Sequence, residues 1–101
     1  MNWWLPHKFE TKRPFLQKRQ DIIQTIRAFF DGIGFDEVET PILQICPTVD
    51  VHIHGFATDL IEPDLSTSHK RYLQTSPEFE MKKLLVAGMP RIYQICKTFR
   101  N

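Results

Sequence analysis

The sequence lacks long hydrophobic runs and is poor in cysteine. No stretch approaches the roughly 18 consecutive apolar residues typical of a membrane-spanning helix, so we expect no membrane association. The first residues lack the basic and apolar blocks of a secretory signal. The two cysteines, Cys46 and Cys96, form no CxxC pair, which favours buried free thiols over a disulfide. Together these absences predict a cytoplasmic protein.

The composition is that of an ordinary globular domain. The chain has 101 residues, of which 42% are hydrophobic and 25% are charged, and these values argue against a disordered tail. Such a length makes one small domain at most, which excludes a two-lobed enzyme within this chain. The net charge of +1 conceals a segregation, because residues 31–68 contain eight acidic residues and no Lys or Arg. The overall charge balance is too even to indicate nucleic-acid binding.

An amphipathic helix is predicted from Pro14 onward, after an irregular arm over residues 1–13. Mostly apolar residues recur there at spacings of three and four, which places them on one helical face. Pro14 suits a first helical position, and Gly32 and Gly34 are placed to end the helix. The recurring residues are Phe15, Arg19, Ile22, Ile23, Ile26, Phe29, Phe30 and Ile33.

The remaining sequence predicts an α+β fold in which a helix leads into an antiparallel sheet and a second helix is inserted. Residues 35–40 alternate apolar and acidic side chains for part of their length and then meet Pro41, which places this strand at an edge or against something other than a ladder partner. Thr75 and Glu78 have the spacing of a capping box at the start of the second helix, and Gly88 ends that helix. The other expected elements are a turn at 62–68 and strands at 49–54 (or an extended loop there), 56–61, 72–74 and 92–100.

The last expected strand has small and polar side chains on one face. Gln94, Cys96, Thr98 and Arg100 alternate with residues that point to the other side. Such a face, ended by an arginine, forms either the floor of a ligand site or an exposed sheet face. The pattern alone does not decide between the two.

Two histidines raise the question of a metal site. His52 and His54 lie on one side of an extended segment, with Cys46 upstream and His69 downstream. A zinc site needs three or four ligands and supporting hydrogen bonds, and no further spacing in the sequence supplies them. We therefore expect a polar strand face and no metal site.

Two motifs in order resemble a known enzyme family. Residues 34–41, Gly-Phe-x-Glu-Val-x-Thr-Pro after a helix, resemble motif 1 of the class II aminoacyl-tRNA synthetases. Residues 75–88, Thr-Ser-Pro-Glu-Phe-x-Met-Lys-x-Leu-Leu-x-x-Gly, and the later Phe-Arg-Asn resemble the lysine-specific branch running into motif 2. The resemblance covers residues 14–101. It implies the N-terminal part of the antiparallel-sheet catalytic domain, with flanking helices, from motif 1 to the start of motif 2.

Within that branch the sequence is more similar to the elongation factor P lysine ligases than to the lysyl-tRNA synthetases. The tRNA enzymes have an anticodon-binding OB-fold domain before motif 1, and only about a dozen residues precede the helix here. Ser76 also resembles the ligases. The resemblance implies ATP-dependent activation of lysine, or β-lysine, and its transfer to a lysine of elongation factor P. Alternatives are a fragment of a lysyl-tRNA synthetase that charges tRNA-Lys, and a catalytically dead dimerisation or regulatory module.

The resemblance also implies a site for the substrate amino acid. Ser76, Pro77 and Glu78 are similar to the family segment that holds it, and a carboxylate there pairs with a substrate ammonium group. Gln94 lies on the same strand face as Arg100 and is expected to help hold the substrate amine.

The nucleotide is assigned to the end of the chain in the same way. Arg100 resembles the catalytic motif 2 arginine that grips the α-phosphate of ATP, and Asn101 is the next ATP-binding position. The strand at Pro41 resembles the dimer interface of the family, which implies a homodimer. The Mg²⁺ ligands and the motif 3 arginine are expected beyond Asn101, so these 101 residues are expected to be inactive alone.

Overall fold

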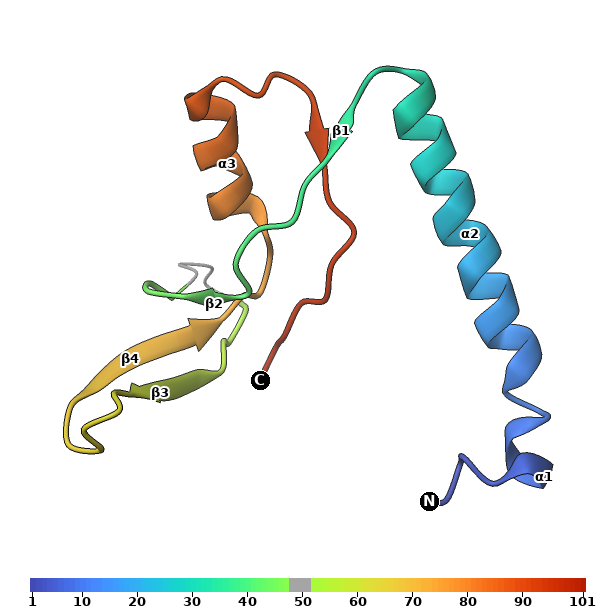
Figure 1. Cartoon of the computed structure of the whole chain (residues 1–101), viewed down its shortest axis with the longest axis horizontal. Coiled ribbons are helices and arrows are strands. Elements are labelled where there is room, and N and C mark those ends of the chain that lie inside the picture. The colour runs from blue at the N-terminus through green and yellow to red at the C-terminus, as the bar shows by residue number, and fades with distance from the viewer. Residues whose placement is uncertain (48–51) are drawn as a thin grey trace. The chain divides into compact units, whose positions relative to one another are not determined.

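The computed structural model describes residues 1–47 and 52–101 (Figure 1). It forms two compact units, Met1–Asp36 and Glu37–Asn101, and each is described by itself. The elements are α1 (Pro6–Phe9), α2 (Arg13–Gly32), β1 (Asp36–Glu37), β2 (Leu43–Gln44), β3 (Ala57–Ile61), β4 (Ser68–Leu73), α3 (Glu78–Ala87) and β5 (Ile92–Tyr93). The predicted mixture of helices and antiparallel strands is confirmed.

The long helix α2 ends as the glycines predict. Gly34 adopts a φ of 81°, a left-handed conformation that glycine reaches without steric cost. Its amide donates to the carbonyl group of Asp31 at 3.2 Å, and the amide of Phe35 donates to that of Phe30 at 3.0 Å. The rings of Phe30 and Phe35 lie 5.4 Å apart, between centroids. These contacts make a Schellman motif with its apolar contact, which ends the helix sharply.

The arm before α2 is more ordered than predicted. Residues 1–13 were expected to be irregular, yet they contain the single turn α1, and α2 already begins at Arg13. Pro6 fixes its own φ for a helical start, and the carbonyl group of Leu5 accepts hydrogen bonds from the amides of Lys8 and Phe9. The Trp3 ring stacks beneath the ammonium group of Lys12, 4.4 Å from the ring centroid. This cation–π contact ties the arm to the start of α2.

A three-stranded antiparallel sheet forms much of the second unit. Its strand order is β2-β4-β3, and β4 is central, with Thr58 opposite Arg71 and Leu43 opposite Leu73. The hairpin of β3 and β4 confirms the strand predicted at 56–61. The strand predicted at 72–74 is longer, because β4 pairs with β3 back to Ser68. The strand or loop predicted at 49–54 falls partly outside the described residues, and residues 52–54 form no strand.

The turn of this hairpin is held by one carboxylate. Asp64 accepts hydrogen bonds from the backbone amides of Ser66 and Thr67, both at 2.9 Å, and from the Thr67 hydroxyl group at 2.7 Å. These hydrogen bonds, chiefly those from Thr67, lower the pKa of Asp64 to about 2 because they favour the charged form. The predicted turn is therefore confirmed. Its cause is the Asp64 carboxylate, which accepts hydrogen bonds from turn amides in place of a backbone carbonyl group.

The strands predicted at 35–40 and 92–100 are much shorter than expected. Strands β1 and β5 form a two-residue ladder, extended by a 3.0 Å hydrogen bond from the Val38 amide to the Tyr93 carbonyl group. Tyr93 is the buried apolar side chain of the described residues. Residues 94–101 are not assigned to a strand, because they contact other segments through separate hydrogen bonds and not through a continuous ladder.

The start of α3 differs from the predicted capping box. The N-cap residue is Pro77, which has no side-chain acceptor, and the hydroxyl group of Thr75 is buried without a partner. Instead, the Ser76 hydroxyl group accepts a 3.2 Å hydrogen bond from the Glu78 amide. The helix begins later than the capping box requires, so Thr75 is too far from the free amides of its first turn. Its predicted end is confirmed, with Gly88 at a φ of 115°.

Both cysteines are free thiols, as the spacing predicts. The expectation that they are buried is wrong for Cys46, which is exposed, and Cys96 is half-buried. Cys46 follows the short strand β2, which pairs on one side only and ends the sheet.

No helix in the described part of the chain is both long and apolar enough to cross a membrane.

Candidate functional site

Three segments of the second unit meet at Gln74, directly after β4. Its backbone amide donates to the carbonyl group of Ile42, and its own carbonyl group accepts from the amide of Phe99, both at 2.9 Å. Its side-chain Nε2 donates to the carbonyl group of Lys97 at 2.8 Å. Gln74 is 0% exposed. It therefore joins the residues after β1, the end of β4 and the last residues of the chain.

This junction places the residues expected to bind ATP. Asn101 donates its backbone amide to the carbonyl group of His54 at 2.8 Å, so Arg100 lies between two backbone-bonded neighbours, Phe99 and Asn101. The Arg100 side chain is exposed and forms no ion pair with any described residue. Its guanidinium group is available to an anion, which is what binding a phosphate requires.

Gln94 contacts the motif 1 segment. Its Oε1 accepts a 2.9 Å hydrogen bond from the hydroxyl group of Thr40, which is 5% exposed. Its Nε2 is shielded from solvent and has no partner. The expected substrate residue therefore has one end of its amide fixed and a donor group left unsatisfied.

The expected Ser-Pro-Glu segment lies at the start of α3. Ser76 and Pro77 are half-buried, and the Glu78 side chain is 69% exposed. Glu78 pairs with Lys82 at 2.9 Å on the same helix. Among the described residues, no hydrogen bond or ion pair joins Glu78 to Gln94 or Arg100. The structure thus anchors the segment of Arg100 and Asn101 through the backbone amides of Phe99 and Asn101, and no hydrogen bond or ion pair among the described residues joins it to Glu78.

The interior of this unit is unusually polar. Of the buried side chains among the described residues, all but Tyr93 are polar: Thr40, Gln44, Gln74 and Thr75. The buried side-chain atoms without a partner there are Gln44 Nε2, Gln74 Oε1, Thr75 Oγ1 and Gln94 Nε2. Each costs roughly 1–3 kcal/mol when it stays unsatisfied, so these side chains do not form an optimised core. From the sequence, no role was expected for Thr40 or Gln74, although Thr40 lies within motif 1 and Gln74 directly precedes the segment 75–88.

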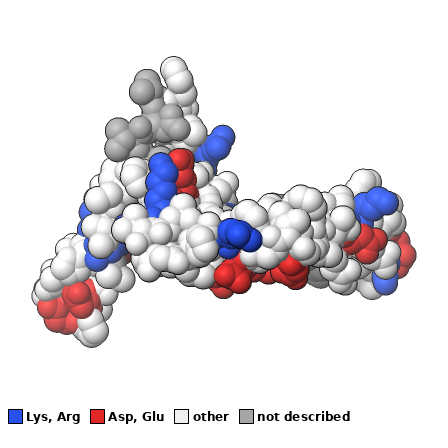
Figure 2. All heavy atoms as spheres, turned by 90° about the horizontal axis from the view of Figure 1, so that it is seen from above, with Lys and Arg blue, Asp and Glu red and all other residues white. Residues whose placement is uncertain are grey.

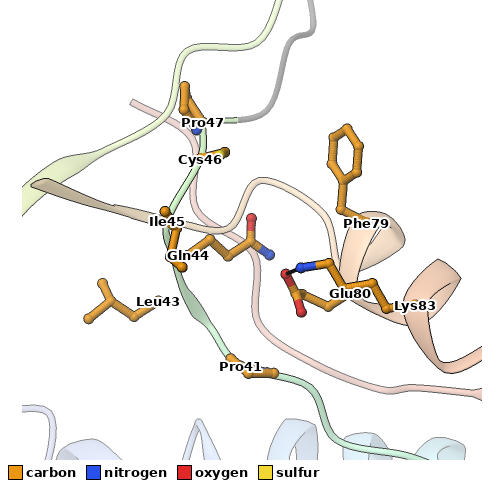
Figure 3. Close-up of a pocket in the computed structure, with 9 residues that line it drawn as sticks. All are labelled: Pro41, Leu43, Gln44, Ile45, Cys46, Pro47, Phe79, Glu80 and Lys83. Atoms are coloured by element: carbon orange, nitrogen blue, oxygen red, sulfur yellow. Dashed lines mark hydrogen bonds and ion pairs between the residues drawn. The ribbon is translucent and has the colours of Figure 1, made fainter. Parts of the chain in front are cut away.

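A separate cavity lies between the segment around β2 and the first turns of α3 (Figure 3). Its volume is about 480 Å³. Gln44 extends from β2 toward α3, where Lys83 and Glu80 form a 2.9 Å ion pair (Figure 3). Pro41 is the one expected site residue in its lining, so this cavity is distinct from the Arg100 region. The lining residues are Pro41, Leu43, Gln44, Ile45, Cys46, Pro47, Phe79, Glu80 and Lys83.

The histidines do not converge with other metal ligands in the described residues. His69 pairs with Glu62 at 3.0 Å across the hairpin turn, and no group of three or more His, Cys, Asp or Glu side chains there is placed to hold a metal ion. Figure 2 shows acidic side chains gathered at the end of the β3–β4 hairpin, where Glu62 and Asp64 lie. On the rest of the face shown, basic and acidic side chains are interspersed.

Comparison with known proteins gives the family. The model of the family described as tRNA synthetases class II (D, K and N) matches residues 3–101. A relative from Photobacterium profundum, named elongation factor P–(R)-beta-lysine ligase, is 45% identical over 86 residues, 85% of this chain and 27% of the relative. Relatives of the same name from Avibacterium paragallinarum and Pseudoalteromonas translucida are 49% and 42% identical, over 85% and 100% of this chain.

The chain spans 27% to 30% of the length of these three relatives. The family model, which matches residues 3–101, nevertheless spans both motifs and Gln74. The resemblance drawn from the motifs is confirmed, and the chain belongs to the class II tRNA synthetase (D, K and N) family.

Proposed function

We propose that this chain is the motif 1 to motif 2 part of a ligase that activates lysine or β-lysine with ATP and transfers it to elongation factor P. The observation that carries the proposal is the similarity to relatives named elongation factor P–(R)-beta-lysine ligase, at 42% to 49% identity over 85% to 100% of the chain. The exposed, unpaired Arg100 at the end of a held backbone segment supports it.

The first step joins the amino acid to the nucleotide. A carboxylate oxygen of lysine attacks the α-phosphorus of ATP, a carboxylate–phosphorus bond forms, and pyrophosphate leaves with the bonding electron pair. Negative charge builds on the α-phosphate oxygens, and the Arg100 guanidinium stabilises it through two parallel hydrogen bonds. Asn101 is assigned to the same nucleotide. In the second step the neutral amine of the acceptor lysine attacks the activated carbonyl carbon, the bond from that carbon to the phosphate oxygen breaks, and an amide forms as AMP and a proton are released.

Substrate recognition is assigned to the start of α3 and to Gln94. Glu78 leaves its exposed ion pair with Lys82 and pairs with the ammonium group of the substrate. The new ion pair is stronger because the ligand excludes water from it. Ser76 and Pro77 line the substrate site next to Glu78. Gln94, fixed by Thr40, presents its amide to the same amino acid.

Mg²⁺ supplies charge neutralisation to ATP reactions of this kind. No group of three or more His, Cys, Asp or Glu side chains among the described residues is placed to hold it, so we assign its ligands to other parts of the ligase.

The acceptor is tested in a hybrid ligase, in which this chain replaces the matching 101 residues of the P. translucida relative. The protein is given ATP, Mg²⁺ and radiolabelled (R)-β-lysine or lysine, with either elongation factor P or tRNA-Lys as acceptor. We expect label on elongation factor P. Label on tRNA-Lys alone would favour a tRNA synthetase, and label on neither, with the parent relative active, would contradict the proposal.

A further inference from the structure

We propose that Gln74 is a positioning residue. Its buried side-chain amide holds the backbone at Lys97, and this places the guanidinium group of Arg100 to bind a phosphate. This inference rests on the proposed function, because it assigns a role through the nucleotide contact of Arg100. Gln74 lies outside both motifs and is not among the site residues that the resemblance implies.

Gln74 makes two hydrogen bonds to one short segment near the end of the chain. Its carbonyl group binds the amide of Phe99, and its side-chain Nε2 binds the carbonyl group of Lys97, two residues earlier. The first bond uses only backbone atoms and survives any substitution. The second depends on the side chain, so a substitution at Gln74 releases Lys97 alone.

The segment has few other attachments. Strand β5 ends at Tyr93, and residues 94–101 lack the regular ladder that would fix a longer strand. Of the described residues that follow Gln94, only Lys97, Phe99 and Asn101 make backbone hydrogen bonds to other segments, and Gln74 provides two of the three. Segments held by few hydrogen bonds open easily, so each bond matters for the position of Arg100.

The side chain of Gln74 is poorly explained by stability alone. Because a carbonyl oxygen only accepts, Lys97 requires Nε2 of Gln74 to face it, which fixes the orientation of the amide. Oε1 is then left buried without a partner, a cost that an apolar side chain of the same length avoids. Methionine should therefore preserve the fold while it releases Lys97.

The test is Gln74→Met in the hybrid ligase, measured by lysine-dependent exchange of pyrophosphate into ATP. We expect the KM for ATP to rise roughly tenfold, as for the loss of one positioning hydrogen bond, with the KM for lysine changed less than about twofold. The matched control is Gln44→Met, because Gln44 is also buried and its Nε2 has no partner. It should leave both KM values unchanged.

The possible outcomes separate the inference from the proposed function. Unchanged KM values in Gln74→Met, equal rises for ATP and lysine, or loss of the folded protein would overturn the positioning role and leave a structural one. Arg100→Ala is measured alongside. If it leaves the KM for ATP and kcat unchanged, the proposed role of Arg100 fails. If it abolishes exchange while Gln74→Met does nothing, only the inference about Gln74 fails.

Discussion

The hydroxyl group of Thr40 donates a 2.9 Å hydrogen bond to Oε1 of Gln94, 54 positions later in the chain. Thr40 directly precedes the proline of motif 1, and Gln94 lies on the approach to motif 2. A substitution at Thr40 in motif 1 therefore acts directly on Gln94, the proposed substrate residue, through this one hydrogen bond.

This contact predicts the effect of Thr40→Val in the hybrid ligase. Valine keeps the shape of threonine but cannot donate, so the Gln94 amide loses its fixed orientation. We expect the KM for lysine to rise about three- to tenfold, the worth of one hydrogen bond, with little change for ATP. Thr25→Val is the control, since the Thr25 hydroxyl group bonds only within α2, to the carbonyl group of Asp21. Equal effects of the two substitutions would contradict the prediction.

Glu78→Gln should weaken lysine binding far more than ATP binding. The substitution removes the charge assigned to the substrate ammonium group, at a cost of about 2–4 kcal/mol once the pair is desolvated. Isothermal titration of the hybrid ligase with lysine and with ATP measures both. Glu80→Gln is the matched control, because Glu80 also lies in the first turn of α3 and pairs with a lysine at 2.9 Å.

The helix itself should survive this change. Glu78 makes no side-chain hydrogen bond that caps α3. Circular dichroism should therefore show the same helix content in Glu78→Gln and in the parent. A parallel loss of helix and lysine affinity would assign Glu78 a structural role.

Local chemistry made the helices and the hairpin predictable. The stripe on α2 and the glycines that follow it set both the helix and its Schellman end, and the breakers after β3 set the turn. The extent of the last strand was not predictable in the same way. Residues 94–101 alternate like a strand, but their partners are single groups such as the carbonyl groups of Gln74 and His54.

The site was only partly predictable for the same reason. Arg100, Asn101 and the Ser-Pro-Glu segment are recognisable from local motifs. The role of Gln74 depends on a hydrogen bond to Lys97 across 23 positions, and that of Thr40 on one across 54. No local pattern encodes such contacts, and β2 is too short, at two residues, to show any periodicity.

The carboxyl group of Asp64 in the hairpin turn should titrate at unusually low pH. Hydrogen bonds lower the pKa of Asp64 to about 2 from its ordinary value of 3.8, so its contribution to stability is present above pH 3.8 and is lost as the pH falls through about 2. An NMR titration of the side-chain carboxyl carbon measures this directly, with Asp64→Asn as the non-titrating control. A midpoint near 3.8 would show that the turn does not hold the carboxylate.

We also expect these 101 residues to self-associate, in keeping with the homodimer implied by motif 1. On α2 the side chains of Phe15, Phe29 and Ile22 are 76%, 61% and 53% exposed, an apolar face that favours burial against another surface. Sedimentation velocity at micromolar concentration should show dimers or larger species.

Ile22→Glu should reduce that association, because it places a charge within the apolar face. Gln24→Glu is the control, since it adds the same charge on the opposite side of the helix. A folded monomer of the unsubstituted chain at all concentrations would contradict the expectation.

The central claim, that Arg100 binds and activates ATP for lysine adenylation, is tested most directly by lysine-dependent pyrophosphate exchange in the hybrid ligase with and without Arg100→Ala. Loss of one well-placed electrostatic group typically slows such a step about 10²–10³-fold, and we predict a loss of that size. Arg91→Ala, at another exposed arginine, should leave the rate unchanged. Exchange by Arg100→Ala at the unsubstituted rate would contradict the account.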